Sequence, residues 1–321
     1  MTILSELVKI WYVSSQRLCN FDCPYCVSTN DYAKSKSTDW KESSDRDKFE
    51  RIVRWMASQD FPVGVRLGTL GEPFASKDFL AQACWLTQQA NVRFVELLTN
   101  GSLLRSRLPK MEATADFAKL SLWITHHHTE ISIASFIENA VFAQERYGCF
   151  VVVNGLLFPD NYEKVSELRQ AALDAGLRFN LDLGYDPGAP AGDHRLAEEM
   201  APVLRTGDGL AQARQLGINP EMLKVNLLAL DGSHGQPCAA GHDYLYIGID
   251  GEAYPCSRYY VLKQSPIGNV ADPDFRINLR ELRWAGCRAK FGCCNKEDFL
   301  NLKLWSDKPR PSVPSLGWTG T

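Results

Sequence analysis

The sequence predicts an α/β protein: an open, partial (β/α)6 barrel of the TIM type, followed by a smaller cysteine-bearing module. Six apolar runs alternate with amphipathic, helix-like stretches through the first 185 residues. Most of the ten cysteines fall into one early group and one late group. A chain of 321 residues with 45% hydrophobic content can bury one large core and a second small one.

The predicted strands of the barrel span residues 8–13, 63–67, 93–99, 118–125, 149–156 and 178–183. Helical stretches are expected near 46–59, 77–90, 131–147 and 161–175, with a weaker one near 103–115. β/α units in series form a parallel sheet with helices outside, and six units rather than eight predict an open barrel. Ligands of such sheets bind at the carboxyl ends of the strands.

These elements place the barrel in residues 1–185. Residues 185–195 are dense in Pro and Gly, and helical stretches are expected near 196–216 and 220–230, so a helical linker region is assigned to 186–237. The cysteine-bearing module is assigned to 238–305. Residues 306–321 are rich in Pro, Gly and Ser and are predicted to form a flexible tail.

Composition narrows the functional classes. The net charge of −3 gives no reason to expect a nucleic-acid partner. No apolar stretch approaches the roughly 20 residues that span a bilayer, so no membrane association is expected. No export signal is recognisable, and ten cysteines without one favour a cytoplasmic, reducing location and metal ligation.

Cys19, Cys23 and Cys26 form a Cys-x3-Cys-x2-Cys run directly after the first predicted strand. Three thiolates so close in sequence can bind one soft metal centre and leave it one ligand short. A zinc site would need a fourth ligand nearby, but the next Cys or His is Cys84. The run therefore favours an iron–sulfur cluster with one iron open to a further ligand.

This run resembles the cluster motif of the radical S-adenosylmethionine (radical SAM) superfamily, including the aromatic Tyr25 directly before the third cysteine. The resemblance implies a partial barrel that holds a [4Fe–4S] cluster and binds SAM at the open iron. It also implies reductive cleavage of SAM to a 5′-deoxyadenosyl radical, with electrons from a partner such as flavodoxin or ferredoxin.

Gly71, Glu72 and Pro73 follow the second predicted strand and look like the superfamily's Gly-Glu-Pro motif, which receives the SAM amino group. Leu70 departs from this motif, because many members have another glycine there. Gly-Glu-Pro is also a common surface turn. Its position one β/α unit after the cysteine run favours the SAM interpretation.

Two further strand ends carry polar residues. Thr99 and Asn100 belong to a Thr-Asn-Gly run that is frequent after the third strand in the superfamily. Asn154 ends the fifth strand, and the resemblance assigns it to the SAM ribose. The alternative is structural: a helix-entry turn at Asn100 and a simple turn at Asn154.

Three consecutive histidines end the fourth predicted strand. Side chains alternate along a strand, so His126 and His128 are expected to share the face toward the cavity. Similar runs in radical SAM enzymes line the SAM carboxylate or the substrate pocket. The alternatives are a metal site and a helix cap at Thr129 or Glu130.

The late cysteines predict a second cluster. Cys238 and Cys256 enclose a predicted hairpin that turns at residues 250–251, and Cys287 follows. This layout resembles the SPASM/twitch module of radical SAM proteins, whose twitch form holds one auxiliary [4Fe–4S] cluster. Cys293 or Cys294 would be the fourth ligand, with Cys293 preferred. Two [4Fe–4S] clusters are thus expected, and a zinc-stabilised appendage is the alternative.

The whole layout is similar to compact twitch enzymes such as 2-deoxy-scyllo-inosamine dehydrogenase. A four-cysteine auxiliary cluster has no open site, which favours electron acceptance and a net oxidation. A small polar substrate of sugar, aminocyclitol or nucleoside type is expected, with Tyr185, Asp182 and Arg258 near it. Surface salt bridges are the alternative role for Asp182 and Arg258. The alternatives are a peptide-modifying radical SAM enzyme and a non-catalytic metal protein.

Overall fold

The computed structural model describes residues 7–26, 35–158, 160–183, 233–288, 296–305 and 315–318, and the single residues Gln215, Lys224 and Leu228. The helices expected near 196–216 and 220–230 therefore lie outside the described residues, apart from these isolated positions.

The six predicted strands and five predicted helices of the barrel are confirmed, with small differences at their ends. The strands are β1 (Val8–Ser14), β2 (Val63–Thr69), β3 (Val92–Thr99), β4 (Leu120–Thr125), β5 (Phe150–Leu157) and β6 (Arg178–Leu183). The helices are α1 (Ser43–Ala57), α2 (Lys77–Thr87), α3 (Leu104–Met111), α4 (Ile133–Tyr147) and α5 (Tyr162–Asp174).

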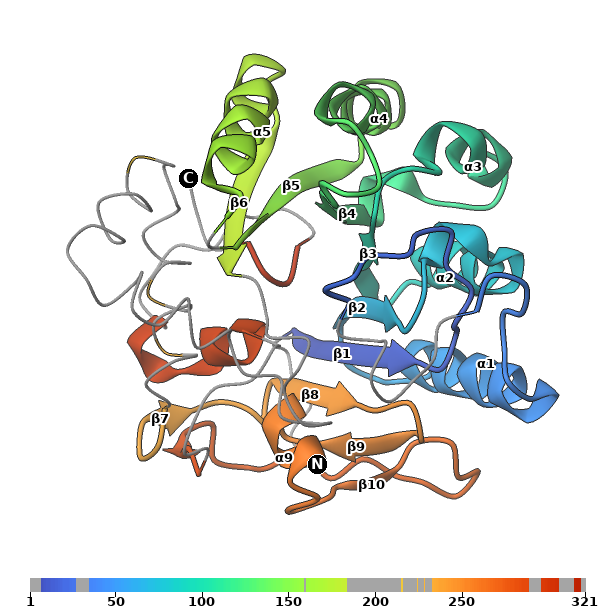
Figure 1. Ribbon diagram of the computed structural model, residues 1–321. Helices are drawn as coiled ribbons and strands as arrows, with labels where there is room; N and C mark the ends of the chain where they lie inside the picture. The colour runs from blue at the N-terminus through green and yellow to red at the C-terminus, as the bar shows by residue number, and fades with distance from the viewer. Residues whose placement is uncertain are drawn as a thin grey trace.

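Strands β1 to β6 are parallel and adjacent in chain order. The five helices lie along the outer side of this curved sheet (Figure 1). Apolar side chains such as Val63, Val65 and Leu67 of β2 join the core between sheet and helices. The intervening residues of the same strand, including Arg66, point into the barrel interior because strand side chains alternate. The predicted α/β, TIM-like partial barrel is confirmed.

The module extends the barrel sheet. It contains β7 (Pro237–Cys238), β8 (Tyr244–Ile247), β9 (Glu252–Tyr254), α9 (Ser257–Val261), β10 (Gly268–Asn269) and β11 (Ala285–Gly286). The hairpin expected at 250–251 is present between β8 and β9, with Gly251 at φ +84° in the left-handed region. Strand β8 pairs in parallel with β1, which gives one nine-stranded sheet. The pairing covers the edge that β1 would otherwise expose.

Two C-terminal segments lie against the barrel. The short helices η3 (Lys296–Asn301) and η4 (Lys303–Trp305) pack beside the module. Residues 315–318 lie on the concave side of the sheet (Figure 1), where Leu316 and Trp318 are 4% and 9% exposed. This part of the chain differs from the flexible tail expected over 306–321, because its apolar side chains find a buried site.

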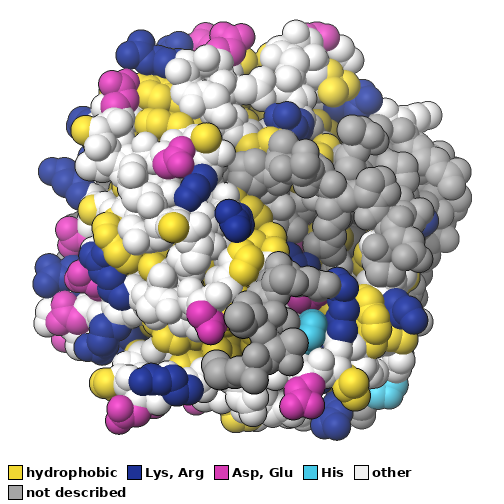
Figure 2. Space-filling view, turned by 180° about the vertical axis from the view of Figure 1, so that it is seen from behind, with side chains coloured by type: hydrophobic (Ala, Val, Ile, Leu, Met, Phe, Trp, Pro, Cys, Tyr) yellow, Lys and Arg dark blue, Asp and Glu magenta, His cyan; other side chains and the backbone are white. Residues whose placement is uncertain are grey.

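On the face of the molecule drawn in Figure 2, positively and negatively charged side chains are interspersed over the described residues. Within the described part of the chain, no helix has the length and apolar character needed to cross a membrane.

Candidate functional site

The cysteine run forms a loop at the carboxyl end of β1. Cys19 and Cys23 are 8% and 5% exposed, and Cys26 is half-buried. Together with Phe21 and Tyr25 they form one cluster of contacting side chains. The structure thus places the three predicted ligands on one loop, at the end of the barrel where parallel-sheet proteins bind ligands.

The Gly-Glu-Pro turn after β2 holds the backbone of this loop. The backbone N–H of Glu72 donates to the carbonyl of Leu18 at 2.7 Å, and the N–H of Gly71 donates to the carbonyl of Gln16 at 3.0 Å. A Cβ at position 71 would overlap the carbonyl oxygen of Leu18. Glycine is therefore required at 71, because the two backbones approach too closely for a side chain. Pro73 begins the short helix η1 (Pro73–Ala75) that follows.

The Glu72 carboxylate joins the ends of β2 and β3. Its Oε1 accepts hydrogen bonds from Thr99 Oγ1 at 2.5 Å and from the N–H of Phe74 at 3.0 Å, and its Oε2 accepts one from the N–H of Asn100 at 2.8 Å. A carboxylate has about four acceptor sites, so these three donors leave one for a ligand. Burial raises the pKa of Glu72 to about 7, although its hydrogen bonds oppose this rise.

The Thr-Asn-Gly turn after β3 also contacts the cysteine loop. Asn100 Nδ2 donates to Asn20 Oδ1 at 3.0 Å, and Asn20 Nδ2 donates to Ser102 Oγ at 2.9 Å. Asn20, which lies next to Cys19, was not predicted to have a role. The structural alternative at Asn100 is also realised, because its Oδ1 accepts the N–H of Ser102 at 3.0 Å.

The prediction that His126 and His128 share the face toward the cavity was wrong. Leu122 and Ile124 of β4 belong to the core between sheet and helices, so strand alternation places His126 on the helix side, and β4 ends at Thr125, before His128. His126 hydrogen-bonds the carbonyl of Ile131 at 3.0 Å and packs edge-on against Phe136, and burial lowers its pKa to about 4. The ring of His128 instead stacks on Tyr25 at 5.3 Å.

His127 was expected to point away from the cavity, but its ring also stacks on Tyr25, with the ring centroids 5.9 Å apart. Tyr25 in addition contacts Phe158, with ring centroids 4.8 Å apart. The aromatic residue before the third cysteine therefore connects the cysteine loop to the residues that follow β4 and β5. Burial raises the pKa of Tyr25 to about 12, so the phenol is neutral at neutral pH.

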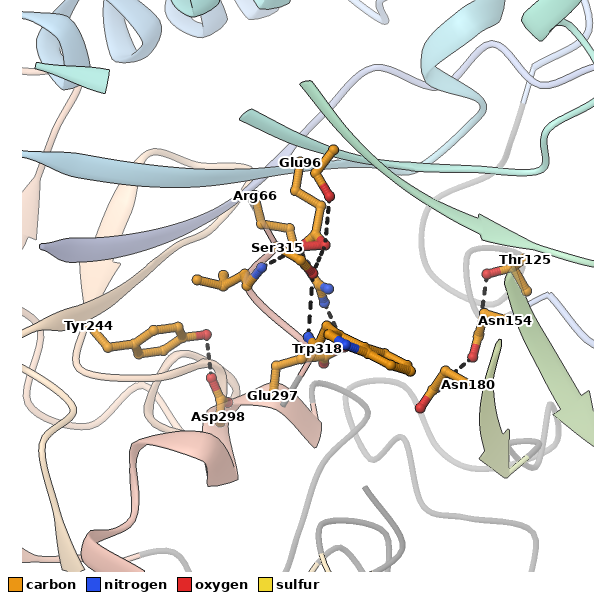
Figure 3. Close-up of polar contacts among 12 residues, drawn as sticks. Arg66, Glu96, Thr125, Asn154, Asn180, Tyr244, Glu297, Asp298, Ser315 and Trp318 are labelled. Atoms are coloured by element: carbon orange, nitrogen blue, oxygen red, sulfur yellow. Dashed lines mark hydrogen bonds and ion pairs between the residues drawn. The ribbon is translucent and has the colours of Figure 1, made fainter. Parts of the chain in front are cut away.

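Asn154 is occupied by protein partners. Its Oδ1 accepts from Asn180 Nδ2 at 2.7 Å, and its Nδ2 donates to Thr125 Oγ1 at 3.3 Å (Figure 3). This chain of amides links β4, β5 and β6 across the barrel interior. A contact from Asn154 to a SAM ribose stays a prediction. The ribose would have to bind an amide that is already hydrogen-bonded to Thr125 and Asn180.

Three predicted auxiliary ligands meet in the module. Cys238, Cys256 and Cys287 line one cavity of about 580 Å³. Arg258, expected near the substrate, lines the same cavity and is 5% exposed. Cys293, Cys294 and Tyr185 lie outside the described residues. In the described part of the chain, no three His, Cys, Asp or Glu side chains are grouped to hold a single metal ion.

Asp298 of η3 fixes the start of α9, beside Cys256. Its Oδ2 accepts hydrogen bonds from the Ser257 N–H at 3.1 Å and from Ser257 Oγ at 2.5 Å, and its Oδ1 accepts one from Tyr244 Oη at 2.5 Å (Figure 3). Burial raises the pKa of Asp298 to about 6, while its two hydroxyl partners oppose the rise. Asp298 lies four residues after Cys294, but a single Asp there gave no signal of its own in the sequence.

A buried ion cluster lies inside the barrel. Arg66 is fully buried, and its Nε donates to Glu96 Oε2 at 2.7 Å. Its Nη1 lies 2.5 Å from Glu297 Oε1 (Figure 3). The guanidinium also lies over the rings of Trp11 and Trp123, 4.8 and 5.0 Å from their centroids. Burial raises the pKa of Glu297, and Arg66 opposes this rise.

Comparison with known proteins rests on three-dimensional structure. No family model matches the chain, and no curated protein matches its sequence. SuiB from Streptococcus suis aligns with a TM-score of 0.54 at 16% identity, covering 85% of this chain and 65% of SuiB. AnSMEcpe with bound AdoMet, which is SAM, aligns with a TM-score of 0.51 at 17% identity, covering 82% of this chain and 78% of anSMEcpe. Both are radical SAM enzymes.

The chain has the radical SAM fold. BtrN in complex with AdoMet and 2-DOIA aligns with a TM-score of only 0.43 at 15% identity, which is too low to support a comparison. The chain spans 65% of the length of SuiB, so the activity of that larger protein is not transferred to it.

The residues of this radical SAM fold suit a cluster beside SAM. Cysteine thiolates are the ligands that iron–sulfur clusters use, and each binds a different iron, so the three sulfurs need not converge on one point. The loop that carries Cys19, Cys23 and Cys26 is held by backbone hydrogen bonds from the turn after β2 and by a side-chain hydrogen bond from the turn after β3. Glu72 keeps one acceptor site for an ammonium group at the same end of the barrel.

Proposed function

We propose that this protein is a radical SAM enzyme, with a [4Fe–4S] cluster on Cys19, Cys23 and Cys26 and SAM beside it. The observation that carries the proposal is that the turns after β2 and β3 both bind the cysteine loop. Three short motifs, each weak alone, thus form one connected site. When bound, the cluster and SAM together supply a 5′-deoxyadenosyl radical that abstracts hydrogen from a substrate carbon.

The chain's own residues bind and orient in this proposal. Glu72 offers its remaining acceptor site to the SAM amino group, and its carboxylate is fixed by Thr99 and Asn100. Tyr25 and His128 form an aromatic wall beside the cysteine loop. Because burial favours a neutral Glu72 below about pH 7, a bound ammonium would favour the ionised form and strengthen its own contact.

The auxiliary module is proposed to hold a second [4Fe–4S] cluster on Cys238, Cys256, Cys287 and one of the cysteines at 293 and 294. The shared cavity of the first three supports this assignment. With four cysteine ligands the cluster would accept an electron, and the net reaction would oxidise a small polar substrate such as a sugar, an aminocyclitol or a nucleoside. A flavodoxin- or ferredoxin-type protein of the cytoplasm would supply the electron that starts the reaction.

A peptide substrate is the second candidate. AnSMEcpe, which shares the fold, has been solved with AdoMet and the Kp18Cys peptide. That structure of a protein with the same fold supports a peptide as the second candidate.

Anaerobic reconstitution tests the proposal. The wild type should bind about eight irons, and a Cys19/Cys23/Cys26→Ala variant about four, with SAM cleaved by the wild type only. Cys149→Ala is the matched control, because it removes a buried thiol that lies away from both sites and should keep all the iron. Bound zinc, or bound iron without SAM cleavage under strong reductant, would leave a non-catalytic metal protein.

Deuterium transfer from labelled substrates into 5′-deoxyadenosine then separates the two substrate classes. Transfer from a sugar, aminocyclitol or nucleoside would support the first candidate. Transfer from a short peptide only would support the second.

A further inference from the structure

The four described residues near the C-terminus fill the middle of the barrel. Leu316 contacts a cluster that includes Trp11 of β1 and Phe94 of β3, while Trp318 contacts Trp123 of β4 together with residues of β5. These side chains belong to the concave face of the sheet, so the segment 315–318 crosses the barrel interior from one side to the other.

Polar contacts fix the segment in place. Glu96 is fully buried, and its Oε1 accepts a hydrogen bond from Ser315 Oγ at 2.6 Å while its Oε2 accepts the N–H of Leu316 at 3.0 Å. The same carboxylate binds Arg66. Two of its donors thus come from the C-terminal segment, and a buried carboxylate that lost them would be left with unsatisfied acceptors.

Shape fixes the segment as well. A Cβ built at Gly317 would lie 2.5 Å from Arg66 Nη2 and 2.9 Å from Glu297 Cγ. Gly317 therefore sits between the two charged side chains where no larger residue fits. The close fit of Gly317 and the two hydrogen bonds to Glu96 show that the segment occupies a specific site.

The depth of the segment follows from the strand register. Phe150, Val152 and Asn154 of β5 share the interior face, and Trp318 packs against the first two. Trp318 thus lies one layer below Asn154, with its ring directed toward the strands that carry Asn154 and Asn180 (Figure 3). At about 3.3 Å per residue, Glu96 lies about 13 Å along β3 from Asn100 at the cysteine-loop end.

We propose that residues 315–318 are a built-in plug that seals the barrel interior below the SAM site. Substrate then enters from the cysteine-loop end only, and water and oxygen are excluded from the opposite end. The sealing role rests on the proposed radical SAM function, while the binding of the plug inside the barrel does not.

The plug is tested first on the full chain by cavity rescue. Trp318→Ala should lower the thermal unfolding midpoint by about 5–10 °C, and added indole should recover part of this loss by filling the vacated site. Trp284→Ala, at a partly exposed tryptophan of the module, is the matched control and should not respond to indole.

Leu316→Ala provides a second variant in case Trp318→Ala does not fold, with the exposed Leu282→Ala as its control. Hydrogen exchange in the wild type should show slow exchange at the Leu316 amide, and Leu316→Ala should exchange faster over 315–318. Exchange in the wild type at the rate of an unstructured peptide, or no indole response in a folded Trp318→Ala, would overturn the plug.

Sealing is tested on the reconstituted holoenzyme. In air, the iron–sulfur absorbance of the holoenzyme near 400 nm should bleach several-fold faster in Trp318→Ala than in the wild type. Added indole should slow the bleaching of the variant again. An unchanged bleaching rate would refute sealing. If the wild type binds no cluster and cleaves no SAM, the proposed function fails, yet the indole and exchange results still decide whether the segment is bound in the barrel.

Discussion

Removing one hydroxyl from the C-terminal segment is expected to destabilise the whole chain. Ser315 Oγ donates to the buried Glu96 Oε1 at 2.6 Å, and hydrogen bonds to charged groups contribute about 1.5–3 kcal/mol. The alternative donor, Ser121 Oγ, is 3.5 Å from the same oxygen, too far to replace the lost bond fully. Ser315→Ala should therefore lower the free energy of unfolding by about 1.5–3 kcal/mol.

Urea unfolding of the full chain measures this loss, as a shift in midpoint without a change in slope. Ser106→Ala is the matched control: its hydroxyl donates to the carbonyl of Leu103 at 2.9 Å, but the group is exposed. Ser315 Oγ in addition accepts the N–H of Trp318 at 3.3 Å, a bond that Ser315→Ala also removes. The control should change stability by less than about 0.5 kcal/mol, as surface substitutions usually do.

A double-mutant cycle shows whether the loss belongs to this contact. Glu96→Gln keeps the shape of the side chain and removes the charge, so Ser315→Ala should cost clearly less in that background than in the wild type. Coupling between contacting residues is typically about 0.5–3 kcal/mol. Two results would refute the argument that the segment is anchored on Glu96. One is a loss of unfolding free energy for Ser315→Ala no larger than that for Ser106→Ala, and the other is the same loss for Ser315→Ala in the wild type and in Glu96→Gln.

Three further predictions concern the cysteine-loop end. Burial raises the pKa of Glu72 from 4.5 to about 7, so between these pH values the native state keeps a proton that the unfolded chain has released. The free energy of unfolding should therefore fall by about 3 kcal/mol as pH rises through this range. Glu72→Gln should flatten this part of the plot of unfolding free energy against pH. Gly71→Ala should cost about 1–3 kcal/mol and reduce bound iron, because its Cβ overlaps the Leu18 carbonyl, whereas Gly68→Ala, with only ordinary contacts, should keep the iron. Tyr25→Ala removes the ring stacking and should lower the free energy of unfolding in urea by about 1–3 kcal/mol, whereas Tyr25→Phe keeps the ring and should not. Equal losses for Tyr25→Ala and Tyr25→Phe would contradict the stacking argument.

The barrel could be predicted because its strands are local features. β2 and β3 are short apolar runs set between amphipathic helices, and consecutive parallel strands pair in chain order. The pairing of β8 with β1 could not be predicted in this way. Those strands are more than 200 residues apart in the chain, and no local spacing encodes which sheet edge a distant hairpin will cover.

The sequence predicted the parts of the candidate site that belong to a short motif. It did not predict the parts that depend on which way a side chain points at the end of a strand. Gly71 and Glu72 were predicted near the cysteine loop from their order in the chain, and the structure places them in contact with it. The face assignment of His126 and His128 failed, because the histidine run alone does not show which face of β4 is the cavity: Ile124 packs toward the helices, so His126 does too, and the strand ends at Thr125. Asn20 was missed because a single Asn beside a cysteine is unremarkable in sequence.

Arg66 carried a signal that could have been used. A lone arginine in the middle of an apolar strand requires a carboxylate partner once it is buried, and Glu96 occupies the paired position on the next strand. Its other partner, Glu297, and the donors from Ser315 and Leu316 come from the far end of the chain, beyond the reach of any local pattern. Buried ion pairs often contribute little stability compared with apolar residues of the same volume. We infer that this cluster contributes specificity, because Glu96 accepts the hydrogen bonds that fix the position of the C-terminal segment and an apolar pair would offer no such acceptors.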